Sequence, residues 1–150
     1  MISLAQLQSF ADRSIAYINE ETIHINDTAL LVPDDKLAVK RLKDKSGIVM
    51  MVRFPQTDTK ISSYDNFSEE NLMLIYIIEA WSDGSFTEQE ETDRFDYLQS
   101  LMKLAKTYIM DNHNLMRADI EKGFRTEFEY QQFGNWNGVS VSFSLKDYEL

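Results

Sequence analysis

The chain has no cysteine and only two histidines among its 150 residues. The absence of cysteine excludes disulfides, thiolate metal ligands and a cysteine nucleophile, and it suits a reducing compartment. The histidines, His24 and His113, are far apart, and neither has a second histidine three or four residues away. Because a helical histidine site needs such a pair, the sequence predicts no metal and no cofactor.

The sequence also lacks a long hydrophobic run. Its longest strongly apolar segment spans residues 72–78, which is too short to cross a bilayer as a helix. The first residues, Met1 to Gln6, carry none of the basic side chains that precede the apolar core of a signal peptide. We therefore expect neither a signal peptide nor a membrane partner, and we expect a cytoplasmic protein.

Basic residues are scarce, because 15 lysines and arginines stand against 25 aspartates and glutamates, for a formal net charge of −10. Affinity for a phosphate backbone comes largely from basic side chains that displace counterions, so no nucleic acid is expected as a partner. The charge is uneven: residues 65–96 contain ten acids and one base, whereas residues 36–53 contain six bases and one acid. The simplest interpretation is two solvated faces, and the alternative is two complementary binding surfaces.

No arrangement typical of catalysis is found. Ser140 lies in the segment Gly138–Ser142, which lacks the second glycine of a nucleophile elbow and has the alternation of a strand. We therefore expect Ser140 to face solvent. The acids between Glu88 and Asp93 are a candidate for a hard cation, but acids in the first turn of a helix are also stabilised by its dipole. The sequence predicts a protein that is not an enzyme and has no catalytic residue.

The clearest pattern is an alternation of period two near the end of the chain. Apolar or β-branched side chains occupy every second position: Phe124, Thr126, Phe128 and Tyr130 first, and then Val139, Val141, Phe143 and Leu145. Such alternation predicts two half-buried strands that face one core, and Asn137-Gly138 is expected to supply a positive φ in their connection. An isolated hairpin is marginally stable, so another layer must cover it.

Apolar side chains at spacings of three and four predict helices. Two segments have this periodicity, residues 4–18 and 87–111. Residues 34–43 are also predicted to be helical, because Pro33-Asp34-Asp35 suits a helix start and the lysines before Gly47 suit its end. Capping-box patterns, Ser3 with Gln6 and Thr87 with Glu90, support the starts of the first and the last helix. The last is the longest, and it is long enough to cross a whole sheet.

Apolar runs at residues 48–54 and 72–81 predict two buried strands, and residues 30–32 predict an irregular segment or a short edge strand. Residues 56–70 are polar and predict an unstructured loop, either the tip of a mobile hairpin or a binding loop. We therefore expect a single α+β domain over residues 1–150. Its antiparallel or mixed sheet should have about four strands, with the long helix and the N-terminal helix packed on it.

The two tryptophans are expected at the ends of elements, where an indole ring is buried and its N–H stays accessible. Trp81 is predicted in the core. Trp136, between asparagines at a hairpin tip, is either buried or an exposed contact residue. With the charged segments, this defines the candidate interaction residues: Lys36, Lys40, Arg41, Lys43, Arg53, Glu88, Glu91 and Trp136.

The segment Phe133–Leu145, with the sequence FGNWNGVSVSFSL, resembles the closing hairpin of small tail-associated proteins of phages and prophage-like elements. The order of elements is also similar over most of the chain. That family includes tail-terminator and tail-completion proteins, which assemble as rings at the end of a tail tube. The resemblance implies a structural protein of a virion-like particle, whose partners are copies of itself and other tail proteins.

The leading hypothesis is therefore a non-enzymatic assembly protein whose basic and acidic segments meet head-to-tail between copies and close a ring. The alternative is an acidic protein-binding module of the inhibitor or immunity type, which uses residues 65–96 against a basic partner. A small hydrolase or ligand-binding domain is a third hypothesis, and no group of residues supports it.

Overall fold

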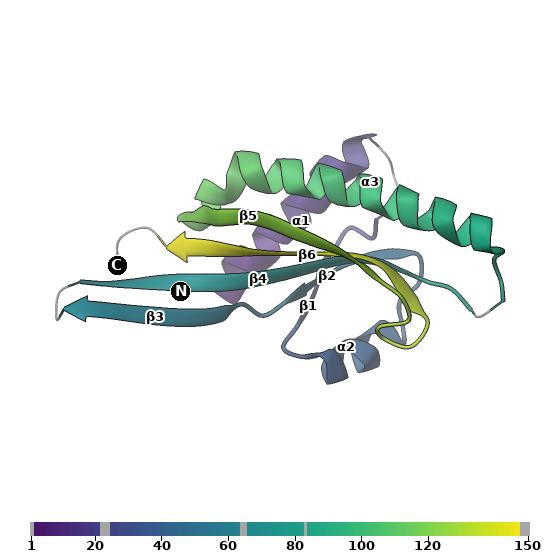
Figure 1. Ribbon diagram of the computed structural model, residues 1–150, viewed down its shortest axis with the longest axis horizontal. Helices are drawn as coiled ribbons and strands as arrows, with labels where there is room; N and C mark the ends of the chain where they lie inside the picture. Colours follow the sequence, from purple (N-terminus) through teal and green to yellow (C-terminus); the bar gives the residue numbers. More distant parts are fainter. Residues whose placement is uncertain (1, 22–24, 64–65, 83, 148–150) are drawn as a thin grey trace.

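The computed structural model describes residues 2–21, 25–63, 66–82 and 84–147, so His24, Asp65 and Asp83 lie outside the described residues. The elements are α1 (Leu4–Glu21), β1 (Leu30–Val32), α2 (Asp35–Leu42), β2 (Ile48–Arg53), β3 (Gln56–Ser63), β4 (Asn66–Ala80), α3 (Glu88–Asn112), the 3-10 helix η1 (His113–Met116), β5 (Ala118–Glu129) and β6 (Trp136–Asp147). They form an α+β structure, as predicted (Figure 1).

The strands form one sheet of six strands in the order β1-β2-β4-β6-β5, with β3 paired to β4 beside β2. The pairs are antiparallel except for β1 and β2, which are parallel. The sheet is therefore mixed, and it has more strands than the four or so expected. One additional strand is β1, at residues for which the sequence predicts an irregular segment or a short edge strand, and the other is β3.

Strand β3 occupies the segment predicted to be a loop. Val52 of β2 faces Ile75 of β4, and Gln56 of β3 faces Leu72, so residues 53–55 stand opposite only two residues of β4. The extra residue lies where β2 ends and β3 begins, and Pro55, which has no backbone donor, is tolerated in this break between the strands. The loop prediction is wrong because all but one of the side chains of β3 are exposed, and such a strand has no apolar alternation.

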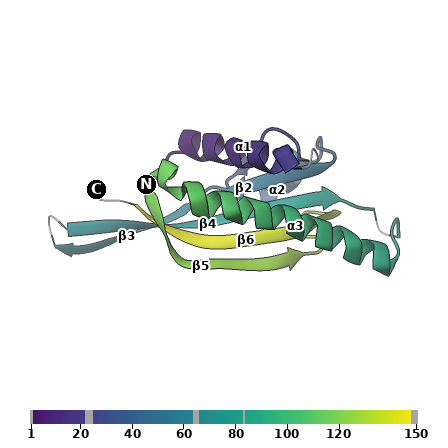
Figure 2. The ribbon, with the colours of Figure 1, turned by 90° about the horizontal axis from the view of Figure 1, so that it is seen from above.

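Strand β3 and the first part of β4 extend past both long helices as a two-stranded arm (Figure 2). From Asn66 to Glu69, β4 pairs with β3 but not yet with β6, whose pairing begins at Glu70. Ile61 and Phe67 face each other near the end of the arm, and 75% of the Ile61 surface is exposed. The arm therefore consists of two strands that no helix covers.

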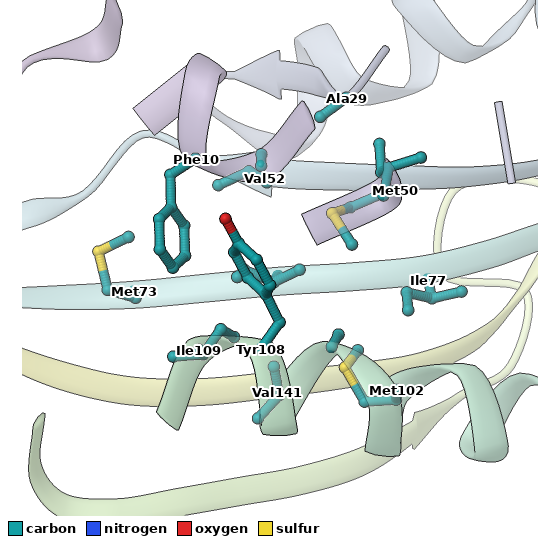
Figure 3. Close-up of a cluster of buried hydrophobic side chains, with 14 of the residues drawn as sticks. Phe10, Ala29, Met50, Val52, Met73, Ile77, Met102, Tyr108, Ile109 and Val141 are labelled. Carbon is teal, nitrogen blue, oxygen red and sulfur yellow. The ribbon is translucent and has the colours of Figure 1, made fainter. Parts of the chain in front are cut away.

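Helices α1 and α3 cover one face of the sheet, and the main core lies between them and the strands (Figures 1 and 3). Both predicted capping boxes form, since Gln6 N donates to Ser3 Oγ at 3.1 Å and Glu90 N donates to Thr87 Oγ1 at 3.2 Å. The β4 and β6 side chains on this face are Met73, Ile75, Ile77, Val139, Val141, Phe143 and Leu145. The predicted inward face of the last strand is thereby confirmed.

Helix α2 lies on the opposite face of the sheet and covers only part of it (Figure 1). Ala38 and Leu42 of α2 form a second cluster with Val32, Val49, Met51, Tyr76, Ile78, Phe133 and Trp136. Phe133 comes from the β5–β6 connection, and its ring meets that of Tyr76 edge-on at 5.2 Å. Farther along the same face, Leu72 is 46% exposed.

This second cluster corrects two expectations from the sequence. Trp136 is not an exposed contact residue, because only 5% of its surface is accessible. Ser140 does not face solvent either, since it is 4% exposed and its Oγ donates to Glu129 Oε1 at 2.8 Å. Both side chains lie on the face that alternation marks as outward, and α2 together with the β5–β6 connection covers that face locally.

The β5–β6 connection also differs from the expectation that Asn137-Gly138 forms its turn. Both residues belong to β6, and the positive φ angles occur at Gln131 (53°) and Gly134 (85°). A Cβ atom on Gly138 would lie 2.1 Å from Ile77 O. Gly138 is therefore required for the close approach of β6 to β4, and not for a turn.

Candidate interaction surfaces

Helix α2 places three lysines on its outward side. Asp34 Oδ1 accepts a hydrogen bond from Leu37 N at 2.8 Å and caps the helix, while Ala38 and Leu42 point into the second cluster. The residues on the outward side, at positions i, i+3, i+4 and i+7, are Lys36, Val39, Lys40 and Lys43, which we call the basic surface. Val39, at its centre, is 40% exposed. No carboxylate of the described residues forms an ion pair with these lysines.

The two arginines that the sequence assigned to the same surface have partners within the chain. Arg41 Nη1 donates to Leu31 O at 2.6 Å, and Arg53 Nη1 lies 3.5 Å from Asp35 Oδ1. Arg41 thereby ties α2 to β1, and Arg53 is partly neutralised. Arg41 is exposed and keeps its charge, but its bond to β1 holds its side chain away from a free orientation, whereas the three lysines have no such bond among the described residues.

The acidic segment does not form one face, because its residues lie at both ends of β4 and on α3. Glu70 lies at the base of the arm, where it pairs with Lys60 at 3.5 Å. Glu79 lies at the other end of β4 and accepts hydrogen bonds from Arg94 Nε at 2.9 Å and from Trp81 Nε1 at 2.8 Å. Glu69 is the neighbour of Glu70 on β4. The other described acids, on the first turns of α3, are Glu88, Glu90, Glu91, Asp93 and Asp96, which we call the acidic end.

The acidic end adjoins a group of aromatic side chains. Phe95, one turn after Glu91, packs edge-on against Phe128 of β5 at 5.6 Å between ring centroids and lies 6.5 Å from the ring of Tyr130. Trp81 supports Phe95 from within, at 4.9 Å. Phe128 and Tyr130 are each 56% exposed, although alternation places them on the inward side. We call Phe95, Phe128 and Tyr130 the aromatic patch.

The exposure of the aromatic patch follows from its position on an edge strand. Strand β5 pairs with β6 on one side only, and α3 covers β5 incompletely. The sequence shows that Phe128 and Tyr130 share a side with Thr126, whose Oγ1 accepts a hydrogen bond from Lys106 of α3 at 3.0 Å. Nothing in the sequence indicates that β5 is an edge strand, so the patch could not be predicted.

The basic surface and the acidic end lie on opposite faces of the sheet and toward opposite edges of it. Helix α2 lies beneath the β1–β2 side of the sheet, whereas α3 lies on the opposite face and meets β5 at the other edge (Figure 1). The first turns of α3 also extend beyond the strands (Figure 2). The lysines of one chain therefore do not reach the acids of its own α3.

Tyr76 and Ser140 are buried side chains that carry hydroxyl groups. Burial raises the pKa of Tyr76 to about 12, and the carboxylates of Glu129 and Asp35 act in the same direction, so this phenol is neutral at physiological pH. Ser140 is bonded to a carboxylate and not to a histidine. His113 Nδ1 lies 2.7 Å from Ala118 O, at the far end of β6.

Neither a metal site nor a well-formed ligand pocket stands out among the described residues. No group of three or more histidines and carboxylates is placed to hold a metal ion there. A groove of about 360 Å³ between α1 and η1 is lined by Ala5, Gln6, Ser9, Phe10, Arg13, Leu115 and Met116. No described helix is long and apolar enough to cross a membrane. No protein-family model and no curated protein matches the chain.

Proposed function

We propose that this protein is a non-enzymatic assembly protein that associates head-to-tail with copies of itself and closes a ring in a phage-like tail. The observation that carries the proposal is the diagonal placement of two surfaces of opposite charge, the basic surface on α2 and the acidic end of α3. Each is exposed, and neither can neutralise the other within one chain. A surface that matches a different surface on the next copy makes a heterologous contact, which closes into a ring when the rotation allows.

Electrostatic matching of this kind supports specificity and orientation more than raw affinity. The lysines of the basic surface carry the positive charge, and Glu88 and Glu91 precede Phe95 by seven and four residues, on the same side of α3. Because all of these groups are at the surface, their attraction should be weakened by salt. The screening length falls from about 10 Å at 0.1 M salt to about 3 Å at 1 M.

Analytical ultracentrifugation at these two salt concentrations tests the proposal. The charge reversal Lys36→Glu with Lys40→Glu should weaken self-association at low salt and should have little further effect at high salt. The matched control is Lys103→Glu with Lys146→Glu, which makes the same change in net charge at two exposed lysines elsewhere. Adding Glu88→Lys and Glu91→Lys to the first variant should restore part of the association, because the coupling belongs to the pair of surfaces.

Two results would overturn the proposal. A wild-type protein that remains monomeric at high concentration would exclude self-assembly. An oligomer that survives the α2 charge reversal unchanged would exclude the head-to-tail contact.

The second candidate function is an acidic protein-binding module that acts on a basic partner. The exposed aromatic patch beside the acidic end favours it, since aromatic side chains with a charged rim are common at protein interfaces. A monomeric wild type whose acidic end binds a basic protein, and loses that binding on Glu88→Lys with Glu91→Lys, would favour this candidate.

A further inference from the structure

We propose that the aromatic patch is the anchor of the contact between copies, and that it receives Val39 and the lysine stems of α2 from the next copy. This inference rests on the proposed self-association and adds to it a site of defined chemistry. The charges set the orientation, and Phe128 and Tyr130 supply the apolar contact that resists salt.

The aromatic patch has the properties of an anchor. Phe128 and Tyr130 present more than half of their surfaces to solvent, yet Phe95 holds their rings from one side at 5.6 Å and 6.5 Å. Phe95 rests in turn on Trp81, which also meets Phe86 edge-on at 5.7 Å. Rings held in place by packed neighbours lose little conformational freedom on binding, and aromatic residues dominate the energetics of interfaces.

The basic surface has the complementary form. Val39 is exposed at the centre of α2, with Lys36, Lys40 and Lys43 around it on the same side of the helix. Lysine stems cover apolar surface while their ammonium groups stay in water, and an ammonium group over an aromatic ring is attracted to the ring face. One surface is thus an apolar centre with a cationic rim, and the other is an aromatic centre beside an anionic rim.

The edge of β5 favours docking of a helix over addition of a strand. Lys122 and Gly123 both have a positive φ, 65° and 81°, and the pairing of β5 with β6 shifts register between Glu121 and Arg125. A bulge of this kind twists an edge strand and interrupts its free hydrogen-bonding groups. The bulge lies just ahead of the patch and limits the length of edge that a strand could join, and α2 of a second copy is the element whose charge fits the acidic end.

Measurement of the dissociation constant of self-association by ultracentrifugation tests the inference. Phe128→Ala and, separately, Tyr130→Gln should each weaken association by about tenfold or more, at low and at high salt alike. Leu115→Ala is the matched control, because Leu115 is 52% exposed on η1, away from the patch, and its removal should leave the dissociation constant unchanged. Thermal unfolding of each variant shows whether the fold is kept.

A second variant on the opposite surface is independent of the folding of β5. Val39→Thr keeps the shape of the side chain and removes its apolar character, and it should also weaken association. Combined with Phe128→Ala, it should weaken association by less than the product of the two single effects, because both remove the same contact.

The outcomes separate this inference from the proposed function. If charge reversal on α2 weakens association while Phe128→Ala, Tyr130→Gln and Val39→Thr do not, the head-to-tail model stands and the aromatic anchor is overturned. The anchor is also overturned if Phe128→Ala and Val39→Thr act independently. A loss at both salt concentrations, with coupling between the two sites, supports it.

Discussion

Apolar side chains of β4 lie on both faces of the sheet, but other elements bury the two faces to different extents. On one face, α1 and α3 bury Met73, Ile75 and Ile77 of β4 along the whole central part of the strand. On the other face, α2 and the β5–β6 connection bury Tyr76 and Ile78, whereas Leu72 on that same face is 46% exposed.

This difference shows that alternation along a strand assigns a side chain to a face but does not say how much of that face is covered. The arm shows that a side chain on the covered face can still be exposed. By register, Phe67 and Ile61 belong to the face that the long helices cover, yet they lie beyond the helices and are exposed. Cover is set by where other elements end, which is a property of the tertiary arrangement.

The largest expected effect comes from the face that the long helices cover. Phe143 is 3% exposed and packs edge-on against Phe124 at 5.2 Å. Phe143→Ala should lower the free energy of unfolding by about 3–5 kcal/mol, whereas Ser142→Ala, on the other face, should change it by less than about 0.5 kcal/mol. Urea unfolding measures both, and equal losses would contradict the assignment of faces.

The smaller cluster on the second face should also contribute to stability. Trp136→Ala should lower the free energy of unfolding by about 3 kcal/mol, because the indole is buried beside Ile78 and Phe133. Fluorescence offers an independent check in the variant Trp81→Phe, whose remaining tryptophan is Trp136. Its emission should resist quenching by acrylamide, and ready quenching would show that Trp136 is an exposed tip residue after all.

Tyr76 makes the second face sensitive to alkaline pH. Burial raises its pKa from 10.0 to about 12, so the neutral phenol is favoured in the folded state. Its contribution to stability is complete below the unfolded pKa near 10 and is lost as the pH rises through the folded pKa, by about 2–3 kcal/mol.

The variant Tyr76→Phe isolates this contribution. Compared with the wild type, it should lose less stability between pH 10 and pH 12 in parallel urea titrations. Identical pH profiles for the two proteins would mean that the phenol titrates normally and that the second face is more open than the structure shows.

The smallest effect is expected on the arm. Ile61 is 75% exposed, so Ile61→Thr, which keeps a β-branched side chain, should change the free energy of unfolding by less than about 0.5 kcal/mol. Met73→Ala, on the same face but under the helices, should cost about 2–5 kcal/mol and serves as the comparison. A loss above about 1 kcal/mol for Ile61→Thr would indicate that the arm packs on the body of the protein.

Much of the secondary structure could be predicted because its causes are local. The helix expected at 87–111 is observed as Glu88–Asn112, since the capping box at Thr87 and the apolar spacing after it act within a few residues. The shorter helix expected at 34–43 is observed as Asp35–Leu42. Strand β3 escaped prediction because its stability comes from pairing with β4, and its own side chains carry no sign of a buried face.

The candidate interaction surfaces were predictable only in part. Opposite charge on two segments is visible in the residue types, and the lysines of α2 are indeed exposed. The groups that bind Arg41, Arg53 and Glu79 within the chain lie on other elements, as does the cover that buries Trp136. The aromatic patch depends on β5 being at the edge of the sheet, which is a matter of strand order.

Periods of two and of about 3.6 residues, together with capping and turn residues, are sufficient to define most elements of this chain and the side of each that turns inward. They act through contacts between near neighbours in sequence. Which face is covered, which strand lies at an edge and which charges remain unpaired depend on contacts between distant segments, such as Trp136 with α2 or Arg94 with Glu79. Those contacts exist only once the chain has folded, and they place the basic surface and the acidic end on opposite faces of the sheet (Figure 1).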